Sequence, residues 1–455
     1  MALLTFLASF CLMQSTELAV QETLRVDYVL IDLLVLDKNN QPVQGLTLKD
    51  FVVKENGKAM DVDTFQVVDF TKLVPESVVT GQAAETPVQK PLVSNQRQQF
   101  IFALDQESLY LTEIRKSFTQ FRNLLESGGL PKDADYLLYS MESGVLTQGF
   151  VSNLDHFIEA VNQFEDRLTQ RYGREVDDKN RARRSGAYRA GGRSSSGNRR
   201  LQELAEQLHS CLSGARSTAS PERKANAISC VRDATQIFVE DEEFRLQRVL
   251  GELEALAYRF EVGTGQKRIF LVSPGFSLSP GQQGIELASY MMSNTYRGGL
   301  HQRGDSLQIA ETMTLPSASS FHKEFQKVVH ACTRNRVVFH SLDLFSNAQE
   351  NASGLDVAGF KRNQADEIRK FYSEYLRAQS MGLERLATTS GGFYARSPNM
   401  KHTIDLWMPR LQHAYLLGYA SPEGKPGKYR KIKIKCKKRG TELHYRRGYF
   451  SANGS

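Results

Sequence analysis

The chain has 455 residues, of which 40% are hydrophobic and 24% charged, with 33 glycines and 13 prolines. This composition allows two to three folded domains and excludes a chain that is disordered throughout, a collagen and a disulfide-dense miniprotein. The net charge of +7 does not indicate a basic protein as a whole, because residues 167–200 contribute eleven of the 58 basic and three of the 51 acidic side chains.

The N-terminal end predicts export. Residues 1–20 form a signal-like segment, whose apolar run at 2–13 has the length of a secretory h-region. No later stretch is apolar enough for a membrane span, so none is expected in the mature chain. The segment lacks a basic n-region and a clear cleavage site, which leaves a buried N-terminal strand or helix as the alternative. The expected location is periplasmic, cell-surface or secreted.

Both ends of the chain have β patterns. Residues 24–70 read as short strands, and the first strand is apolar on both faces for most of its length. Residues 71–96 contain three prolines and read as a linker. Residues 412–451 return to three predicted strands, at 414–420, 429–437 and 443–450, and isoleucines alternate with lysines in the second of them. Each segment is too small to cover its own apolar faces, so we expect one β-sandwich built from both.

Residues 97–411 alternate strands with helices. A continuous apolar run at 100–104 is typical of a strand buried on both faces, and the shorter apolar runs within 267–273 and 336–343 predict further strands. Apolar residues recur at helical spacing between these runs. The pattern predicts an α/β domain with a doubly wound, mainly parallel sheet.

Two insertions interrupt this domain, at residues 167–262 and at 277–320, and the second is expected to lie over the C-terminal edge of the sheet. Residues 167–200 are rich in Arg, Gly and Ser and almost lack aliphatic residues, which predicts disorder. Residues 201–262 are predicted to be a helical insertion. The candidate side chains for contact with an anionic surface are Arg183, Arg184, Arg189, Arg193, Arg199 and Arg200. A solvated linker is the alternative, and nucleic acid is disfavoured because export separates the chain from it and only two tyrosines offer stacking.

The cysteines do not form a metal motif, because none of the five has a C-x-x-C partner. Cys211 and Cys230 lie on either side of a Ser-, Gly- and Pro-containing break between two helical patterns. In an exported protein they could form a disulfide. Two unrelated buried thiols are the alternative.

Several segments, in their order along the chain, resemble the VWFA-related domain proteins abundant in acidobacteria. They are residues 26–65, the strand that ends at Asp105, 267–276 (KRIFLVSPGF), 337–343, 383–392 (LERLATTSGG), 415–421 and 427–450. The resemblance implies a von Willebrand factor A fold, export, and a binding or adhesion role without known catalysis. The resemblance implies no particular ligand for this chain, and we expect an unidentified protein partner at the C-terminal edge of the sheet.

The resemblance also implies where a metal ion would bind. Members of the family hold a divalent cation through D-x-S-x-S after the first strand, a threonine from a second loop and an aspartate from a third. Asp105 matches in register, whereas Glu107 stands at the first serine position and Ser108 is one place late. The threonine position falls near Ser152, and Asp343 ends a neighbouring strand. These five residues are the candidate metal ligands of an altered site.

Two departures argue against a bound metal ion. The third-loop acid is replaced by the sequence Ser-Pro-Gly at 273–275, and Leu109 removes the second serine hydroxyl. We therefore expect no cofactor, with an altered magnesium site as the alternative and Asp105 as a helix cap.

The chain is not expected to be an enzyme, since it contains no H-E-x-x-H, G-x-S-x-G or P-loop motif. The leading hypothesis is an exported, non-catalytic von Willebrand A-like module for protein binding or adhesion in the cell envelope, with a degenerate metal-ion-dependent adhesion site. The alternative is an intracellular RNA-associated protein that uses the same fold and the Arg-rich segment. Processing of the N-terminus discriminates between the two.

Overall fold

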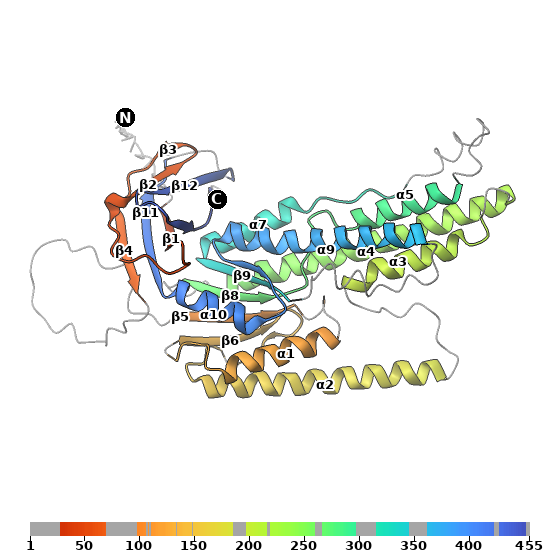
Figure 1. Cartoon of the computed structure of the whole chain (residues 1–455), viewed down its shortest axis with the longest axis horizontal. Coiled ribbons are helices and arrows are strands. Elements are labelled where there is room, and N and C mark those ends of the chain that lie inside the picture. Colours follow the sequence, from red (N-terminus) through yellow and green to blue (C-terminus); the bar gives the residue numbers. More distant parts are fainter. Residues whose placement is uncertain are drawn as a thin grey trace, which may run out of the picture.

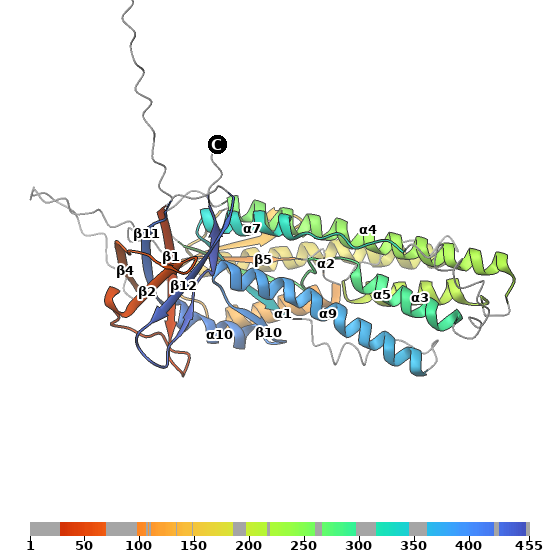
Figure 2. The same ribbon diagram turned by 90° about the horizontal axis from the view of Figure 1, so that it is seen from above.

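The computed structural model describes most of the chain in two parts, a β-sandwich and an α/β domain from which a helical bundle projects (Figures 1 and 2). The described residues are 28–69, 98–105, 108, 111–132, 134–147, 149–184, 197–215, 219–259, 266–296, 315–344, 362–422 and 427–451. The signal-like segment and the linker lie outside them. No helix in these ranges has a stretch long and apolar enough to cross a membrane.

The α/β domain is built on a six-stranded sheet with the strand order β10-β9-β8-β5-β6-β7. Its strands are β5 (Gln98–Leu104), β6 (Ala134–Ser140), β7 (Gly144–Val145), β8 (Lys267–Val272), β9 (Val337–Asp343) and β10 (Tyr394–Arg396). All neighbours pair in parallel except β7, which is antiparallel to β6. The predicted α/β class is thus confirmed, with one mixed, mainly parallel sheet.

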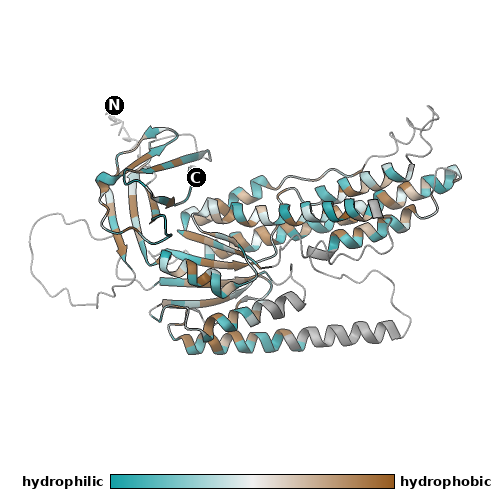
Figure 3. Ribbon diagram, in the orientation of Figure 1, coloured by the Kyte–Doolittle hydropathy of each residue, from teal (hydrophilic) through white to brown (hydrophobic). Residues whose placement is uncertain are grey.

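Helices cover both faces of this sheet, because the strands are buried on both sides. One face carries α1 (Leu111–Glu126), α2 (Leu154–Arg184) and α10 (Met400–Leu411). The other carries α4 (Pro221–Arg259), α7 (His322–Arg334) and α9 (Arg362–Ser390). Figure 3 shows the hydrophobic residues concentrated on the strands between these helices.

The two longest helices on the second face extend beyond the sheet (Figure 2). The C-terminal halves of α4 and α9 pack on the strands, whereas their N-terminal halves form a separate core with α3 (Gly197–Leu212) and α5 (Gln282–Tyr296). Cys211 of α3 and Cys230 of α4 form a disulfide with a Cα–Cα distance of 5.6 Å. The helical insertion is therefore part of a bundle that shares α4 and α9 with the domain.

The prediction of disorder over the Arg-rich segment is wrong for its first part. Residues 167–184 continue α2, and 197–200 begin α3. Residues 185–196 lie outside the described ranges. The physical reason is that Leu168 still packs in the core, and that Glu, Asp, Gln and Arg are good or tolerable helix formers, so α2 extends beyond its buried residues.

The sandwich consists of two four-stranded sheets, ordered β13-β1-β11-β4 and β14-β12-β2-β3. The N-terminal segment supplies β1 (Tyr28–Leu36), β2 (Phe51–Glu55), β3 (Lys58–Ala59) and β4 (Thr64–Asp69). The C-terminal segment supplies β11 (His413–Ala420), β12 (Tyr429–Cys436), β13 (Glu442–His444) and β14 (Gly448–Phe450). Each sheet pairs strands from both ends of the chain, as the sequence predicted.

The first strand is apolar on both faces because it contacts two cores. Ile31 and Leu33 lie in the sandwich core, whereas Leu34 and Leu36 join the core of the α/β domain. This shared apolar contact holds the sandwich against the sheet.

The prediction of one strand over residues 443–450 is wrong. The structure has β13 paired with β1 and β14 paired with β12, so the chain changes sheets between them. Residues 445–447 make the crossing. Each of these strands has only three residues, which is too short for a periodic pattern that would show the change of sheet in the sequence.

Candidate functional site

The candidate site lies at the carboxyl edge of the sheet, where β5 ends at Asp105. The carboxylate is buried and accepts two hydrogen bonds, from Ser273 Oγ to Oδ2 at 2.7 Å and from Ser108 N to Oδ1 at 3.3 Å. Burial raises the pKa of Asp105 above its ordinary value, against the opposing effects of these bonds and of the charge of Arg245. Asp105 and Ser108 are the only two predicted metal ligands that the described structure brings together.

A buried guanidinium faces this carboxylate. Arg245 of α4 donates from Nη1 to Ser108 Oγ at 3.4 Å and to Gly275 O at 3.2 Å. It also donates from Nη2 to Gln379 Oε1 at 2.9 Å and to Glu242 Oε2 at 3.2 Å. The edge of the sheet is therefore occupied by an internal cation that is fixed by four acceptors.

Glu242, which lies on the same face of α4, compensates the positive charge of Arg245. It forms ion pairs with Arg245 and with Arg200 of α3, the second at 3.4 Å, and Tyr375 OH donates to it at 3.2 Å. Burial acts to raise the pKa of Glu242, but the charges of Arg245 and Arg200 outweigh it and hold the pKa below its ordinary range. Glu242 is thus ionised at neutral pH and charge-paired, which is what a buried carboxylate requires.

The loop after β8 is held against α9 by a glycine. Gly275 has a φ of +100°, and a Cβ at this position would lie 2.4 Å from Gln379 O. The next residue, Phe276, donates its N–H to the same carbonyl at 3.0 Å. This close approach positions the Ser273 hydroxyl to donate to Asp105 and the Gly275 carbonyl to accept from Arg245.

Asp343 belongs to a separate cluster. It ends β9, and β8 lies between β9 and β5, so the two carboxylates start about 10 Å apart at the usual strand spacing. Ser380 Oγ donates to Asp343 at 2.8 Å, Tyr394 OH donates at 3.4 Å, and Arg396 pairs with it at 3.6 Å. Asp343 is therefore satisfied by its own partners and does not join Asp105.

Ser152 does not lie at this edge. Its hydroxyl donates to Asp135 at the start of β6, which is the amino edge of the sheet. The antiparallel strand β7 takes the chain back to that side. Glu107 lies outside the described residues. The predicted five-residue metal site is therefore not assembled, and no group of three or more His, Cys, Asp or Glu side chains suited to a metal occurs in the described ranges.

The predicted anionic-surface arginines are not one exposed group. Arg200 is directed to Glu242, and its side chain is 19% exposed. Arg183, Arg184 and Arg199 lie in helical backbone of α2 and α3, whereas Arg189 and Arg193 lie outside the described residues. Arg200 is thus structural rather than available to a surface.

Sequence reasoning missed Arg245, Glu242 and Gln379. A signal was present in α4, because Glu242 and Arg245 interrupt a stripe of buried residues that continues on both sides. Charged residues within an apolar helix face are unusual unless they are paired. Their partners on α3 and α9, however, are not apparent from the sequence of α4.

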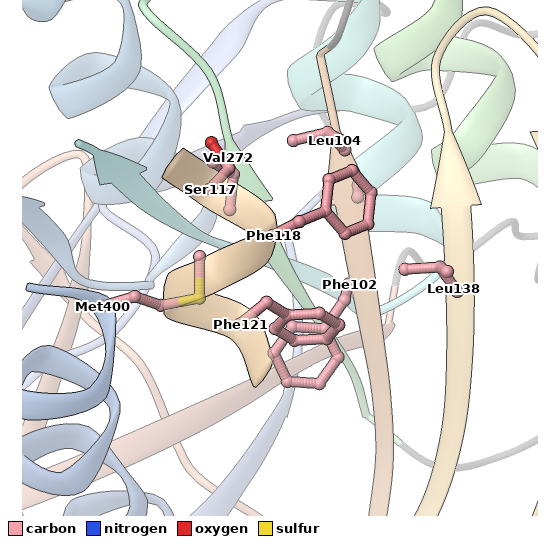
Figure 4. Close-up of a pocket in the computed structure, with 9 residues that line it drawn as sticks. Phe102, Leu104, Ser117, Phe118, Phe121, Leu138, Val272 and Met400 are labelled. Carbon is pink, nitrogen blue, oxygen red and sulfur yellow. The ribbon is translucent and has the colours of Figure 1, made fainter. Parts of the chain in front are cut away.

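The other face of the sheet has an apolar hollow under α1 (Figure 4). Phe118 and Phe121 of α1 face Phe102 of β5, and Met400 of α10 closes one side. Ser117 supplies the one hydroxyl in the lining. With so few polar groups to orient a ligand, this hollow is a packing defect in the core rather than a candidate site.

No family model, curated protein or solved structure matches the chain.

Proposed function

We propose that the chain is an exported, non-catalytic module of von Willebrand factor A type that binds a protein in the cell envelope without a bound metal ion. The observation that carries this proposal is the position of the buried Arg245 side chain. Its guanidinium occupies the space beside Asp105 and Ser108, the two residues that match the expected cation ligands. A fixed positive charge in this space repels a divalent cation and offsets the attraction between that cation and the Asp105 carboxylate.

The sheet supports the assignment to this fold type. Its parallel strands and one antiparallel edge strand have helices on both faces, and ligands of such sheets bind outside the carboxyl ends of the strands. The segments that resemble the family supply β1, β5, β8, β9 and the C-terminal strands.

The disulfide supports export. Cystine pairs persist in oxidising compartments, and Cys211 and Cys230 are paired. The alternative RNA-associated role depended on the Arg-rich segment. Arg200 of this segment is paired to a buried acid, which weakens that alternative.

The proposal is tested by capture of envelope proteins on the full chain, with magnesium or with EDTA in the buffer. Ser143 is exposed in the turn between β6 and β7 at the carboxyl edge, and Ser152 is exposed at the amino edge. We expect Ser143→Arg to reduce capture of the partner at least ten-fold and the matched variant Ser152→Arg to leave it unchanged. EDTA should have no effect.

Loss of capture in EDTA, or equal losses in both serine variants, would refute the proposal. N-terminal sequencing of the protein from cells tests export separately. A retained Met1 in the cytosol would favour the RNA-associated alternative.

A further inference from the structure

A row of lysines follows one strand of the sandwich. Successive side chains of β12 point to opposite faces of the sheet, so its two isoleucines lie in the sandwich core. The lysines that alternate with them are exposed, and they are Lys431, Lys433, Lys435 and, directly after the strand, Lys437. In Figure 1 this strand lies at the end of the molecule away from the helical bundle.

The neighbouring strand β2 adds a fifth lysine to the same face. Lys54 lies directly opposite Lys433 in the antiparallel register, so the two side chains share the outer face of the sheet. Like charges in directly opposite positions destabilise an antiparallel pair. Lys431 and Lys435 lie opposite Gly448 and Val52, which offer no compensating charge. We call these five lysines the lysine face.

Acidic side chains near the lysine face are engaged elsewhere. Glu55 of β2 points to the inner face, where Arg430 Nη1 donates to it at 3.0 Å. Asp50 lies near Lys437, but its carboxylate accepts hydrogen bonds from Thr47 N at 2.8 Å and from Thr47 Oγ1 at 2.9 Å. Residues 428–441 contain no Asp or Glu. The lysine face therefore has a clear excess of positive charge.

The lysines are close enough to act together. Alternate residues of a strand are about 6.6–6.8 Å apart, so the row from Lys431 to Lys437 is about 20 Å long. This spacing is shorter than the Debye length of about 8 Å at physiological ionic strength. The charges therefore attract an extended anionic surface jointly.

An exposed aromatic residue stands at one end of the row. Tyr429 begins β12 on the same face as Lys431, and it is 42% exposed. Its ring lies 5.0 Å from that of Phe450 on β14. Tyrosines with one apolar side and one polar tip are enriched where membranes meet water.

The chemistry of the lysine face favours a lipid surface over other anionic partners. Lysine is a flexible point charge, whereas arginine has the rigid fork that suits bidentate recognition of nucleic-acid phosphates. One exposed tyrosine does not make a platform on which successive bases stack. Protein interfaces have an apolar, fully buried centre, and the centre of this face is charged.

We propose that the lysine face binds the surface of a membrane that contains anionic phospholipids, with Tyr429 at the interface between headgroups and acyl chains. The anionic-surface contact that the sequence assigned to the Arg-rich segment thus belongs to the sandwich. This contact is separate from the proposed protein partner at the carboxyl edge of the α/β sheet. One lysine near such a membrane strengthens binding roughly five-fold.

The test is titration of the full chain with vesicles of phosphatidylglycerol and phosphatidylcholine, with vesicles of phosphatidylcholine alone as the reference. We expect binding only to the anionic vesicles, and it should weaken as sodium chloride is added. The double variant Lys433→Gln with Lys435→Gln should weaken binding at least ten-fold. The matched control, Lys323→Gln with Lys327→Gln, removes the same charge from exposed lysines of α7 and should change binding less than two-fold.

A second variant keeps the proposal testable if the double variant fails to fold. Lys54→Gln lies on the other strand and should weaken vesicle binding roughly five-fold. It should also raise the urea midpoint, because it removes the like-charge pair with Lys433. No binding to the anionic vesicles, or equal losses in the two double variants, would overturn the proposal. Binding of polyglutamate or single-stranded RNA that depends on Lys433 and Lys435, without binding of vesicles, would also overturn it and assign the face to a protein or a nucleic acid.

Discussion

Replacing Arg245 with methionine should destabilise the α/β domain strongly. Methionine fills the volume of the aliphatic chain but removes the charge that Glu242 and Asp105 face. Among the described residues, Glu242 would keep one cation, Arg200 at 3.4 Å, and its hydrogen bonds from Tyr375 and Gln379, whereas Gln379 Oε1 would lose its donor at 2.9 Å. Breaking a buried ion pair by removing one partner costs about 3–5 kcal/mol, because the remaining charge is left in a poorly solvated site.

This free energy corresponds to a large thermal shift. At roughly 2.1 cal/mol/K of unfolding entropy per residue, 1 kcal/mol lowers the melting temperature of a domain of this size by about 1.5 °C, so the expected decrease is roughly 5–8 °C. Urea unfolding followed by circular dichroism measures the same loss as a lower midpoint with an unchanged slope.

The double variant Arg245→Met with Glu242→Gln provides the control. It removes both charges, so we expect it to be more stable than Arg245→Met alone by about 2 kcal/mol or more. The reasoning would be refuted if Arg245→Met lost less than about 1 kcal/mol, or if the two single losses simply added.

Three further predictions concern other parts of the molecule. Burial, followed by the charge of Arg268, holds the pKa of His340 well below its ordinary value, so the unfolded chain takes up a proton that the folded chain does not. The free energy of unfolding should therefore fall as the pH drops below about 6.5, by up to about 1.4 kcal/mol per pH unit. Urea titrations at several pH values measure this dependence, and His340→Gln should reduce its slope. An unchanged slope in the variant would contradict the role of His340. Reducing the disulfide should cost the helical bundle about 3 kcal/mol in thermal unfolding, whereas the double variant Cys211→Ser with Cys230→Ser should not respond to reductant at all. Gly275→Ala should destabilise the folded protein by more than about 1 kcal/mol, because its Cβ would meet a carbonyl oxygen. The matched variant Gly251→Ala has open space within α4 and should stabilise the protein by about 0.5–1 kcal/mol in the same chemical unfolding assay. Equal effects of the two substitutions would count against the packing argument.

The sequence by itself determined the elements and their pairing to a large extent. Apolar runs such as residues 100–104 are typical of strands covered on both faces, and the β segments at the two chain ends each lacked a partner. These constraints act locally, through side-chain periodicity. They therefore predicted the α/β sheet and the split sandwich, and they left the pairing of Cys211 with Cys230 open.

Only the tertiary structure decided the composition of the site. Ser152 was expected beside Asp105, but the short strand β7 reverses the chain and takes this serine to the opposite edge. Arg245 reaches Ser108, beside Asp105, because two long helices pass the edge of the sheet and continue into the bundle. Packing between elements distant in sequence sets the direction of the two-residue strand β7 and the path of the 39-residue helix α4. The side-chain periodicity within one element therefore does not predict either of them.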